Sequence, residues 1–243
     1  MNRVSLKKNT WGEKENLDPK LKKIINKIKD EALRKRLLEF LDNLSVEING
    51  KSYVGLPLKE APASRFYHHS YPGGLVEHIL SVINIAMALC NSVEKIYGGK
   101  VNRDLVISGV ILHDVFKPLT YEKKNNGTYR NSPLGERLDH LTLVVTELVR
   151  RGFPLDLIHI VAASHGQASP ITPKTIEALI CHIADEADSK MNGEVLNAAK
   201  YLIREVTGES WDKIDSKTAF KILMLKAEGG WEGLKKEIER LKP

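Results

Sequence analysis

The feature that most constrains this chain is a histidine–aspartate pair at the end of an uncharged, apolar stretch. The stretch runs from Leu105 to Leu112, and His113 and Asp114 follow it directly. Its composition predicts a buried helix, which would place Asp114 at the edge of a dry interior. An ionised carboxylate is costly there unless a cation, a hydrogen-bond network or a metal ion compensates its charge.

Two other apolar segments also contain polar residues. His78 lies in the run from Leu75 to Cys90, and His182 and Asp185 lie in the segment from Ile176 to Ala187. Each residue taken singly is better explained as a helix cap or a hydrogen-bonded core residue. Their coincidence on apolar helices favours a metal site with imidazole and carboxylate ligands. The predicted ligands are His78, His113, Asp114 and Asp185.

Length and composition predict one soluble globular domain. The chain has 243 residues, of which 42% are hydrophobic and 28% charged, which argues against disorder. Cys90 and Cys181 both lie in apolar runs, so a disulfide framework and a CxxC metal motif are excluded. The net charge of +6 permits anionic substrates, although the lysines are scattered among acidic residues.

The beginning of the chain has no apolar segment of signal-peptide type, and the apolar runs are too short or too interrupted to span a bilayer. We therefore expect a cytoplasmic protein that does not associate with membranes. The sequence does not predict its oligomeric state.

The apolar periodicity predicts an all-α fold with one or two minor β-hairpins. Asn49-Gly50 lies between two short β-type runs, which is typical of a two-residue hairpin, and a second hairpin is expected through residues 125–127. We expect an N-terminal extension (1–60) packed on the core, a central helical domain (61–207) and closing C-terminal helices (208–243), together one compact domain. Helices are expected at 19–28, 31–44, 74–97, 103–115, 133–151, 154–164, 173–189 and 194–206.

Five segments between Arg65 and Lys190 contain most of these polar residues: HHSYPGGLVEHILSV, VILHDVFKP, GERLDHL, ASHG and LICHIADEADSK. In this order and at these separations they resemble the HD superfamily of metal-dependent phosphohydrolases. They look most like the HD domain of bacterial 3′-to-5′ exoribonucleases that carry an OB-fold in front. No OB-fold is recognisable here, because residues 1–60 predict two helices and a hairpin, so the substrate of those enzymes is not transferred.

The resemblance implies an HD-domain helical bundle with a divalent cofactor: Mn, Fe, Ni, Co, Zn or Mg. It assigns the first metal to His78, His113, Asp114 and Asp185, and makes Asp188 a residue that supports a ligand. In two-metal members, His140 and an adjacent histidine pair supply further ligands. Here the pair is Ser164-His165, so a second metal held by His140 and His165 is one alternative, and substrate binding by these two histidines is the other.

The resemblance also implies that a metal-activated water hydrolyses a phosphoester of a nucleotide or nucleic acid. Asp114 would act as ligand and possible proton acceptor, and His140, His165 and Lys117 would offset the charge on the phosphoryl oxygens. The helix that begins after Pro72 makes a natural anion site with the cationic side chains before it. The candidate substrate contacts are Arg65, His68, His69 and Lys117.

Two questions stay open at this point. The substrate distinguishes a nucleotide phosphomonoesterase from a phosphodiesterase or exonuclease, and the few aromatic residues near the motifs permit both. A non-catalytic HD module that binds a metal or nucleotide as a regulator is the alternative from a different class.

Overall fold

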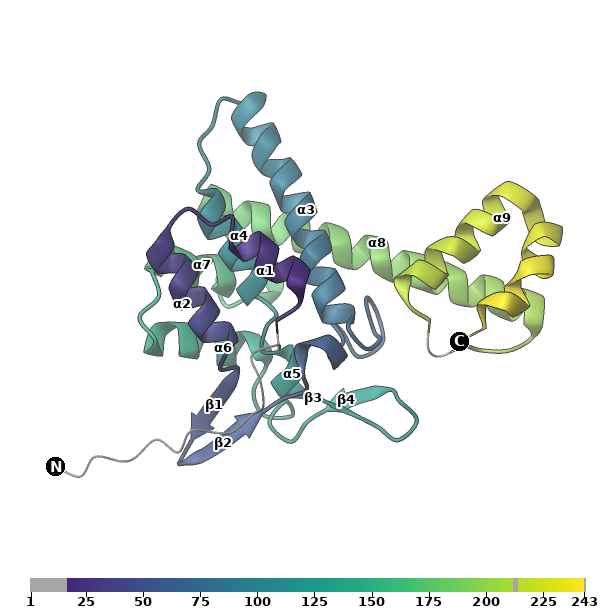
Figure 1. Ribbon diagram of the computed structural model, residues 1–243, viewed down its shortest axis with the longest axis horizontal. Coiled ribbons are helices and arrows are strands. Elements are labelled where there is room, and N and C mark those ends of the chain that lie inside the picture. Colours follow the sequence, from purple (N-terminus) through teal and green to yellow (C-terminus); the bar gives the residue numbers. More distant parts are fainter. Residues whose placement is uncertain (1–16, 212–213, 243) are drawn as a thin grey trace.

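The computed structural model describes residues 17–211 and 214–242, and helices form most of this part of the chain (Figure 1). The predicted all-α class with two minor hairpins is confirmed. The hairpins pair β1 (Ser45–Ile48) with β2 (Lys51–Val54) and β3 (Tyr121–Lys123) with β4 (Tyr129–Asn131). Residues 1–16 of the expected N-terminal extension lie outside the described residues.

The extension begins with two short helices, α1 (Pro19–Ile25) and α2 (Glu31–Leu41). Both have an aspartate N-cap, since Asp18 and Asp30 accept hydrogen bonds from the first backbone N–H groups. The first hairpin turns at Asn49 and Gly50, whose φ angles of 51° and 74° are those of the predicted two-residue turn. Apolar residues of both helices belong to the main core, so the extension packs on the central helices.

The central part consists of α3 (Gly74–Lys95), α4 (Arg103–Leu112), the short α5 (Lys117–Thr120), α6 (His140–Arg150), α7 (Leu155–Ala162) and the long α8 (Ile176–Thr207). α3 and α8 pack on each other and on α4. By length and composition α3 is the one described helix that meets the criteria for a membrane span, but half of the relevant window is buried within the fold.

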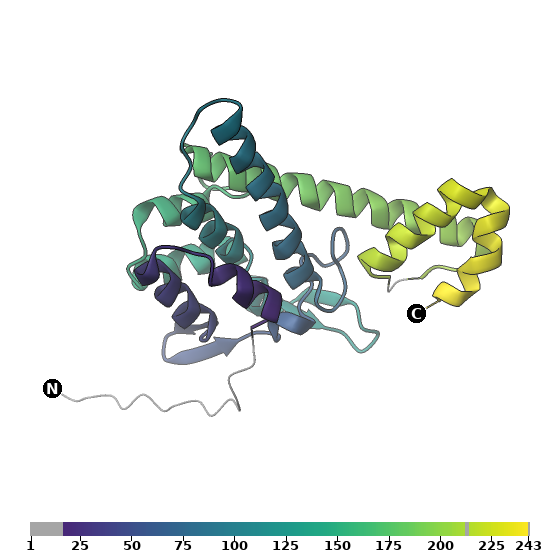
Figure 2. The same cartoon turned by 45° about the horizontal axis from the view of Figure 1, so that its top comes forward.

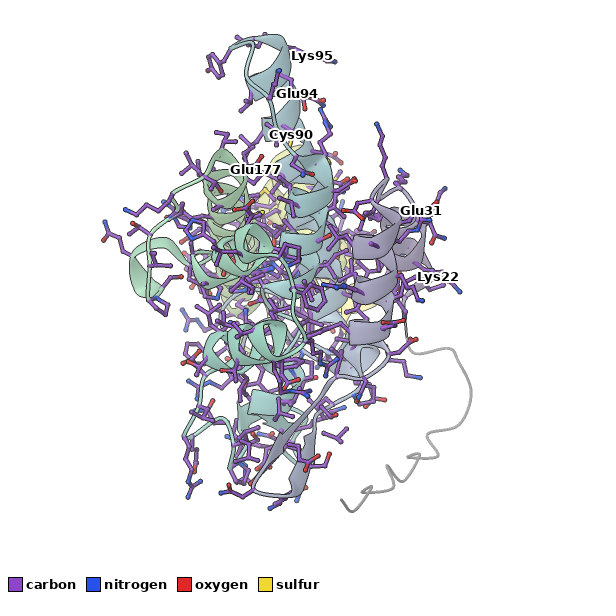
Figure 3. All side chains as sticks on the ribbon, turned by 90° about the vertical axis from the view of Figure 1, so that its left-hand side faces the viewer. Lys22, Glu31, Cys90, Glu94, Lys95 and Glu177 are labelled. Carbon is purple, nitrogen blue, oxygen red and sulfur yellow. The ribbon has the colours of Figure 1, made fainter. Side chains whose placement is uncertain are left out.

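Polar contacts join α3, α4 and α8 at the start of α4. Arg103 bonds Glu94 near the end of α3, and the backbone N–H of Asn102 donates to Glu177 at the start of α8 (Figure 3). These contacts lie at the opposite end of α4 from His113, which is the C-cap of that helix. The start of α4 is therefore held in place beside α3 and α8.

Most helix ends lie within about three residues of the prediction, and two helices differ from it by more. α6 begins at His140, not at Pro133, because Asp139 caps it by accepting from the Thr142 N–H, while residues 133–139 form turns. α8 is continuous where two helices are expected, and it runs through Asn192 and Gly193. Gly193 leaves room for the ring of Tyr67, since a Cβ there would lie 2.3 Å from Cζ of Tyr67.

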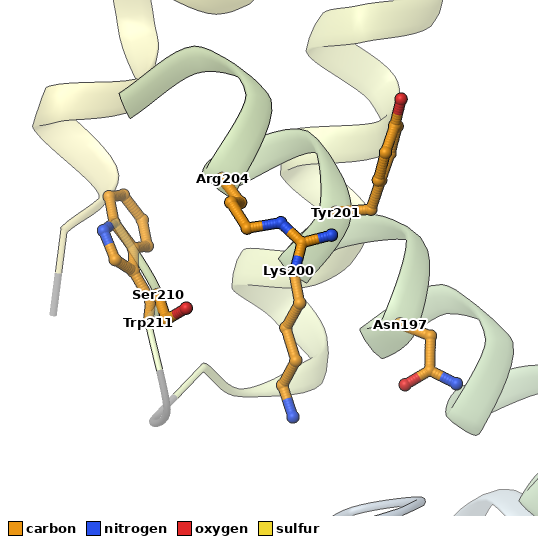
Figure 4. A pocket seen from close by; sticks show the side chains of 6 residues that line it. All are labelled: Asn197, Lys200, Tyr201, Arg204, Ser210 and Trp211. Atoms are coloured by element: carbon orange, nitrogen blue, oxygen red, sulfur yellow. The ribbon is translucent and has the colours of Figure 1, made fainter. Parts of the chain in front are cut away.

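The end of α8 carries α9 (Ser216–Glu237) and a final 3-10 turn, η3 (Ile238–Leu241), which project away from the central helices (Figures 1 and 2). We call residues 194–211 and 214–241 the C-terminal arm. The sequence predicts closing helices on one compact domain, whereas the arm has its own apolar cluster. A hollow on the arm is lined by Asn197, Lys200, Tyr201, Arg204, Ser210 and Trp211 (Figure 4). Asn197, the first of these residues along α8, lies ~18 Å from Asp185 along that helix, at 1.5 Å per residue.

Candidate metal centre

The four predicted ligands of the first metal come together in the interior. Nε2 of His78 lies 3.3 Å from Oδ2 of Asp114 and 3.2 Å from Oδ1 of Asp185. Nε2 of His113 lies 3.3 Å from Nε2 of His78, 3.4 Å from the same Asp114 oxygen and 3.5 Å from Oδ1 of Asp185. All four residues are buried. Separations of this size are those of ligand atoms that surround one ion at about 2.0–2.2 Å.

The helices explain why these side chains meet. His78 lies in the second turn of α3, His113 and Asp114 follow the last turn of α4, and Asp185 lies in the third turn of α8. These three helices pack pairwise. Each ligand therefore comes from an element that the apolar core holds in place, which pre-organises the site.

The protons of the two histidines point away from the centre. Nδ1 of His113 donates to the Val110 carbonyl at 2.7 Å, and Nδ1 of His78 donates to Oδ2 of Asp188, also at 2.7 Å. In neutral imidazoles both Nε2 atoms then present lone pairs, and they face two carboxylate oxygens. Four acceptors this close together require a cation between them, so the donor set fits a divalent metal ion.

Lys117 does not supply enough charge for this role. Its ammonium group is buried and contacts Oδ2 of Asp114. It is one positive charge against three buried carboxylates, those of Asp114, Asp185 and Asp188. The remaining negative charge in a dry site is what a divalent ion neutralises.

The pKa values of these groups reflect the same imbalance. Burial alone would lower the pKa of His78, but hydrogen bonds to Asp114, Asp185 and Asp188 raise it well above its ordinary value. Burial opposes ionisation of Asp114, yet His113, Lys117 and the hydrogen bonds from His140 and His78 hold its pKa well below the usual range. In the metal-free protein a proton on His78 would therefore compete with a metal ion for the same nitrogen, and metal binding would displace it.

A second group of potential ligands adjoins the first through Asp114. Oδ1 of this residue lies 3.1 Å from Nε2 of His140 and 3.7 Å from Nε2 of His165, and the two imidazole nitrogens are 3.0 Å apart. Burial lowers the pKa of His140, which keeps its ring neutral. Both histidines are partly exposed, so this second group lies on the open side of the buried one.

Ser164, which stands where the resemblance implies a histidine, is buried and its hydroxyl has no hydrogen-bond partner among the described residues. His159 and His182 lie outside both groups. Nε2 of His159 accepts from the Lys174 N–H, and Nδ1 of His182 bonds the Ser164 carbonyl. These two histidines satisfy local backbone groups.

The four predicted substrate contacts lie in different settings. His68 is beside the site, with its ring centroid 5.2 Å from that of His78, and both its nitrogens are shielded from solvent without a partner. Burial and the charges of Lys117 and His78 lower the pKa of His68 to about 3. Arg65 is exposed, with its guanidinium 5.5 Å from the Phe66 ring centroid.

His69 is buried, and both its ring nitrogens are engaged inside the protein. Nε2 lies 2.9 Å from Oδ2 of Asp188, and Nδ1 lies 2.9 Å from the Tyr71 hydroxyl. Asp188 therefore joins His69 to the ligand His78. Sequence patterns alone mark Asp188 only through its spacing of three from Asp185, and they do not reveal its partners.

Comparison with known proteins agrees with the fold and the centre. Residues 75–190 match the model of the HD domain family. The dihydroneopterin 2′,3′-cyclic phosphate phosphodiesterase of Methanocaldococcus jannaschii is 42% identical over 223 residues, which cover 92% of this chain and 88% of that enzyme. The chain belongs to the HD-domain family and is a metal-dependent phosphohydrolase.

The 3′-5′ exoribonuclease YhaM provides a shorter match. The Bacillus subtilis enzyme is 33% identical over 142 residues, which cover 54% of this chain and 43% of the exoribonuclease, and that of Bacillus velezensis is equally similar over 141 residues. No solved structure matches the chain.

Proposed function

We propose that the protein is a phosphodiesterase that opens a small 2′,3′-cyclic phosphate ester to a phosphomonoester with two divalent metal ions. The observation that carries the proposal is the position of Asp114, whose two oxygens face two separate groups of histidines. A carboxylate placed in this way is typical of a bridge between paired metals. Three side chains at the outer position leave room for solvent and substrate, as catalytic sites require.

A cyclic phosphate is favoured over RNA by the extent of the similarity. The phosphodiesterase of M. jannaschii matches 92% of this chain, whereas the exoribonuclease of B. subtilis matches 54% of it. The ligands His78, His113, Asp114 and Asp185 are buried, whereas His140 and His165 beside them are partly exposed. A small ester does not need the extended electropositive groove that binds a single-stranded nucleic acid.

The chain's own residues have separate roles in this proposal. His78, His113, Asp114 and Asp185 would hold the inner metal, and Asp114, His140 and His165 the outer one. The metals supply Lewis-acid activation of the phosphoryl group and lower the pKa of a water molecule. Lys117 offsets negative charge that builds on the phosphoryl oxygens.

His68 is proposed to contact the substrate because its neutral ring has one donor and one acceptor without partners. Buried polar groups are rarely left unpaired, so an orphan beside a reactive centre indicates a ligand contact. Arg65 is exposed on the same loop, and we propose that it attracts the anionic substrate. His69, engaged on both sides, is proposed to act on His78 through Asp188 instead.

The net reaction consumes one water molecule. The water oxygen bonds to phosphorus, one of the two ester P–O bonds of the ring breaks, and the released alkoxide oxygen ends as a hydroxyl with a proton from water. The low pKa of Asp114 favours the role of ligand over that of proton acceptor. We also propose a cytoplasmic location, consistent with the two buried, unpaired cysteines.

The test compares four kinds of substrate with metal-free protein reloaded with Mn²⁺ or Fe²⁺. Dihydroneopterin 2′,3′-cyclic phosphate and nucleoside 2′,3′-cyclic phosphates should yield monoesters, while nucleoside monophosphates and single-stranded RNA should not react. Asp114→Asn serves as the inactive control. Shortening of RNA without ring opening would instead make the protein an exoribonuclease, and failure of all substrates at full metal loading would favour a regulatory HD module.

A further inference from the structure

The C-terminal arm is joined to the metal centre by one buried polar path. The apolar cluster of the arm includes Leu196, Ile203, Trp211, Ile222 and Leu234, and its one described member from earlier in the chain is Tyr71. Tyr71 belongs to the loop that precedes α3 and contains His68 and His69. Its ring lies in the cluster of the arm, whereas its hydroxyl takes part in the polar contacts of the loop.

Three groups meet at the Tyr71 hydroxyl. It lies 2.9 Å from Nδ1 of His69, donates to Glu77 at 2.9 Å, and contacts the hydroxyl of Ser216. Ser216 is the first residue of α9 and is buried. The beginning of α9 is therefore hydrogen-bonded to the loop through the hydroxyl of Tyr71.

Asn192 makes a second connection between the same elements. Its Nδ2 donates to Oγ of Ser216 at 2.5 Å, and its Oδ1 accepts from the backbone N–H of His69 at 2.7 Å. His69 has a φ of 43°, in the left-handed region that is unfavourable for a residue with a side chain. The contacts of Asn192 and Tyr71 hold His69 in this conformation.

The path ends at a metal ligand. Nε2 of His69 lies 2.9 Å from Oδ2 of Asp188, and this same oxygen accepts from Nδ1 of His78 at 2.7 Å. The carboxylate that orients the His78 ring is thus itself oriented by His69. Partners of this kind determine ring orientation and ligand basicity at metal sites.

We propose that Ser216, Tyr71 and Asn192 are positioning residues through which the C-terminal arm sets the metal affinity of the inner site. Apolar contacts would join the arm to the core at a lower desolvation cost than the buried polar side chains of His69, Asp188, Asn192 and Ser216. The polar path also leads to Nδ1 of the proposed ligand His78, the ring nitrogen that does not face the metal position. This inference requires metal binding at His78 but holds for any phosphoester substrate.

The experiment measures metal affinity without turnover. Co²⁺ is titrated into metal-free protein and followed by its visible absorption, for the native chain, Ser216→Ala, Tyr71→Phe and Ile222→Val. Ser216→Ala and Tyr71→Phe should raise the Kd for Co²⁺ at the inner site by about tenfold or more. Ile222→Val is the matched control, because Ile222 is buried in the arm cluster and its apolar side chain takes no part in the hydrogen bonds of the polar path. It should lower the melting temperature and leave the Kd unchanged.

A double-mutant cycle separates positioning from general destabilisation. If Ser216 acts through Asp188, then Ser216→Ala should have little further effect on the Kd of an Asp188→Asn protein. Ser216→Thr, which retains a hydroxyl, should recover most of the native affinity. The proposal fails if Ser216→Ala and Tyr71→Phe bind Co²⁺ within about twofold of the native Kd, or if their effects add fully to that of Asp188→Asn. Neither result depends on which substrate is hydrolysed.

Discussion

Nδ1 of His165 lies 3.0 Å from Oδ2 of Asp185, while the other oxygen of this aspartate faces the inner metal position. The N–H of His165 is used in this bond, so its Nε2 turns its lone pair toward Oδ1 of Asp114. In the proposed two-metal centre, Asp185 would thus be an inner ligand and also orient His165 at the outer position. This arrangement would compensate in part for Ser164, which cannot act as the further imidazole ligand.

We predict that His165→Ala reduces the metal content from two ions to one per chain. The outer position would keep only His140 and one Asp114 oxygen, and kcat should fall on the order of 100-fold or more. Elemental analysis after dialysis and steady-state kinetics measure the two effects. His159→Ala is the matched histidine control, since His159 bonds only the Lys174 backbone outside the centre. Two tightly held ions in His165→Ala would rule out this assignment.

Replacement of Asp114 by asparagine should remove both metals and abolish turnover. It should also destabilise the fold, because Lys117 would remain buried without its anionic partner. Loss of one member of a buried pair costs about 3 kcal/mol or more. Thermal unfolding of the metal-free proteins isolates this contribution. An Asp114→Asn protein that keeps its metal and its activity would show that the centre is built differently.

Metal affinity should rise with pH. The pKa of His78 is raised well above its ordinary value in the metal-free protein, so below that raised pKa a proton must leave when the metal binds. The apparent Kd for Co²⁺ should therefore decrease by up to about tenfold per pH unit while one proton is displaced. A Kd that is constant between about pH 6 and about pH 8 would contradict a protonated His78.

The raised pKa of His78 has the opposite effect on the stability of the metal-free protein, which should decrease as the pH rises. A histidine whose folded pKa is raised stabilises the metal-free fold fully below its unfolded pKa, and this contribution is lost as the pH rises through the folded pKa. Denaturant unfolding of metal-free protein should accordingly show a lower contribution from His78 at alkaline pH. Added metal should reverse this trend, since it binds the deprotonated ring.

Gly193→Ala should disturb the loop beside the site. The added methyl group would lie 2.3 Å from Cζ of Tyr67, so the aromatic ring must move, at a cost of about 1–3 kcal/mol. The higher helix propensity of alanine offsets up to about 1 kcal/mol of that cost. Gly229→Ala is the control, because a Cβ there meets nothing within 4 Å. Equal melting temperatures for the two variants would show that Tyr67 does not pack tightly on α8.

The convergence of the four residues proposed to hold the inner metal was predictable because their chemistry conflicts with their surroundings. His78, the His113-Asp114 pair and Asp185 interrupt apolar helices, and few compensations exist for charge in a dry interior. The hairpin at Asn49-Gly50 was predictable for a local reason, since these residues accept the positive φ of a tight turn. The predicted start of α6 was wrong. Ser132-Pro133 and Asp139-His140 are both good helix starts, and the structure uses the second.

By itself, then, the sequence determined the helical class and the residue types of the buried site, since these follow from periodicity and the cost of buried charge, and its motifs indicated the family by resemblance. Tertiary structure decided which oxygen of Asp114 faces which histidines, that His69 bonds Asp188, and that α8 continues through Gly193 to carry the arm. Those outcomes depend on the direction of single side chains across packed helices. Directions of this kind are set by contacts between residues more than 100 positions apart, such as His78 and Asp188.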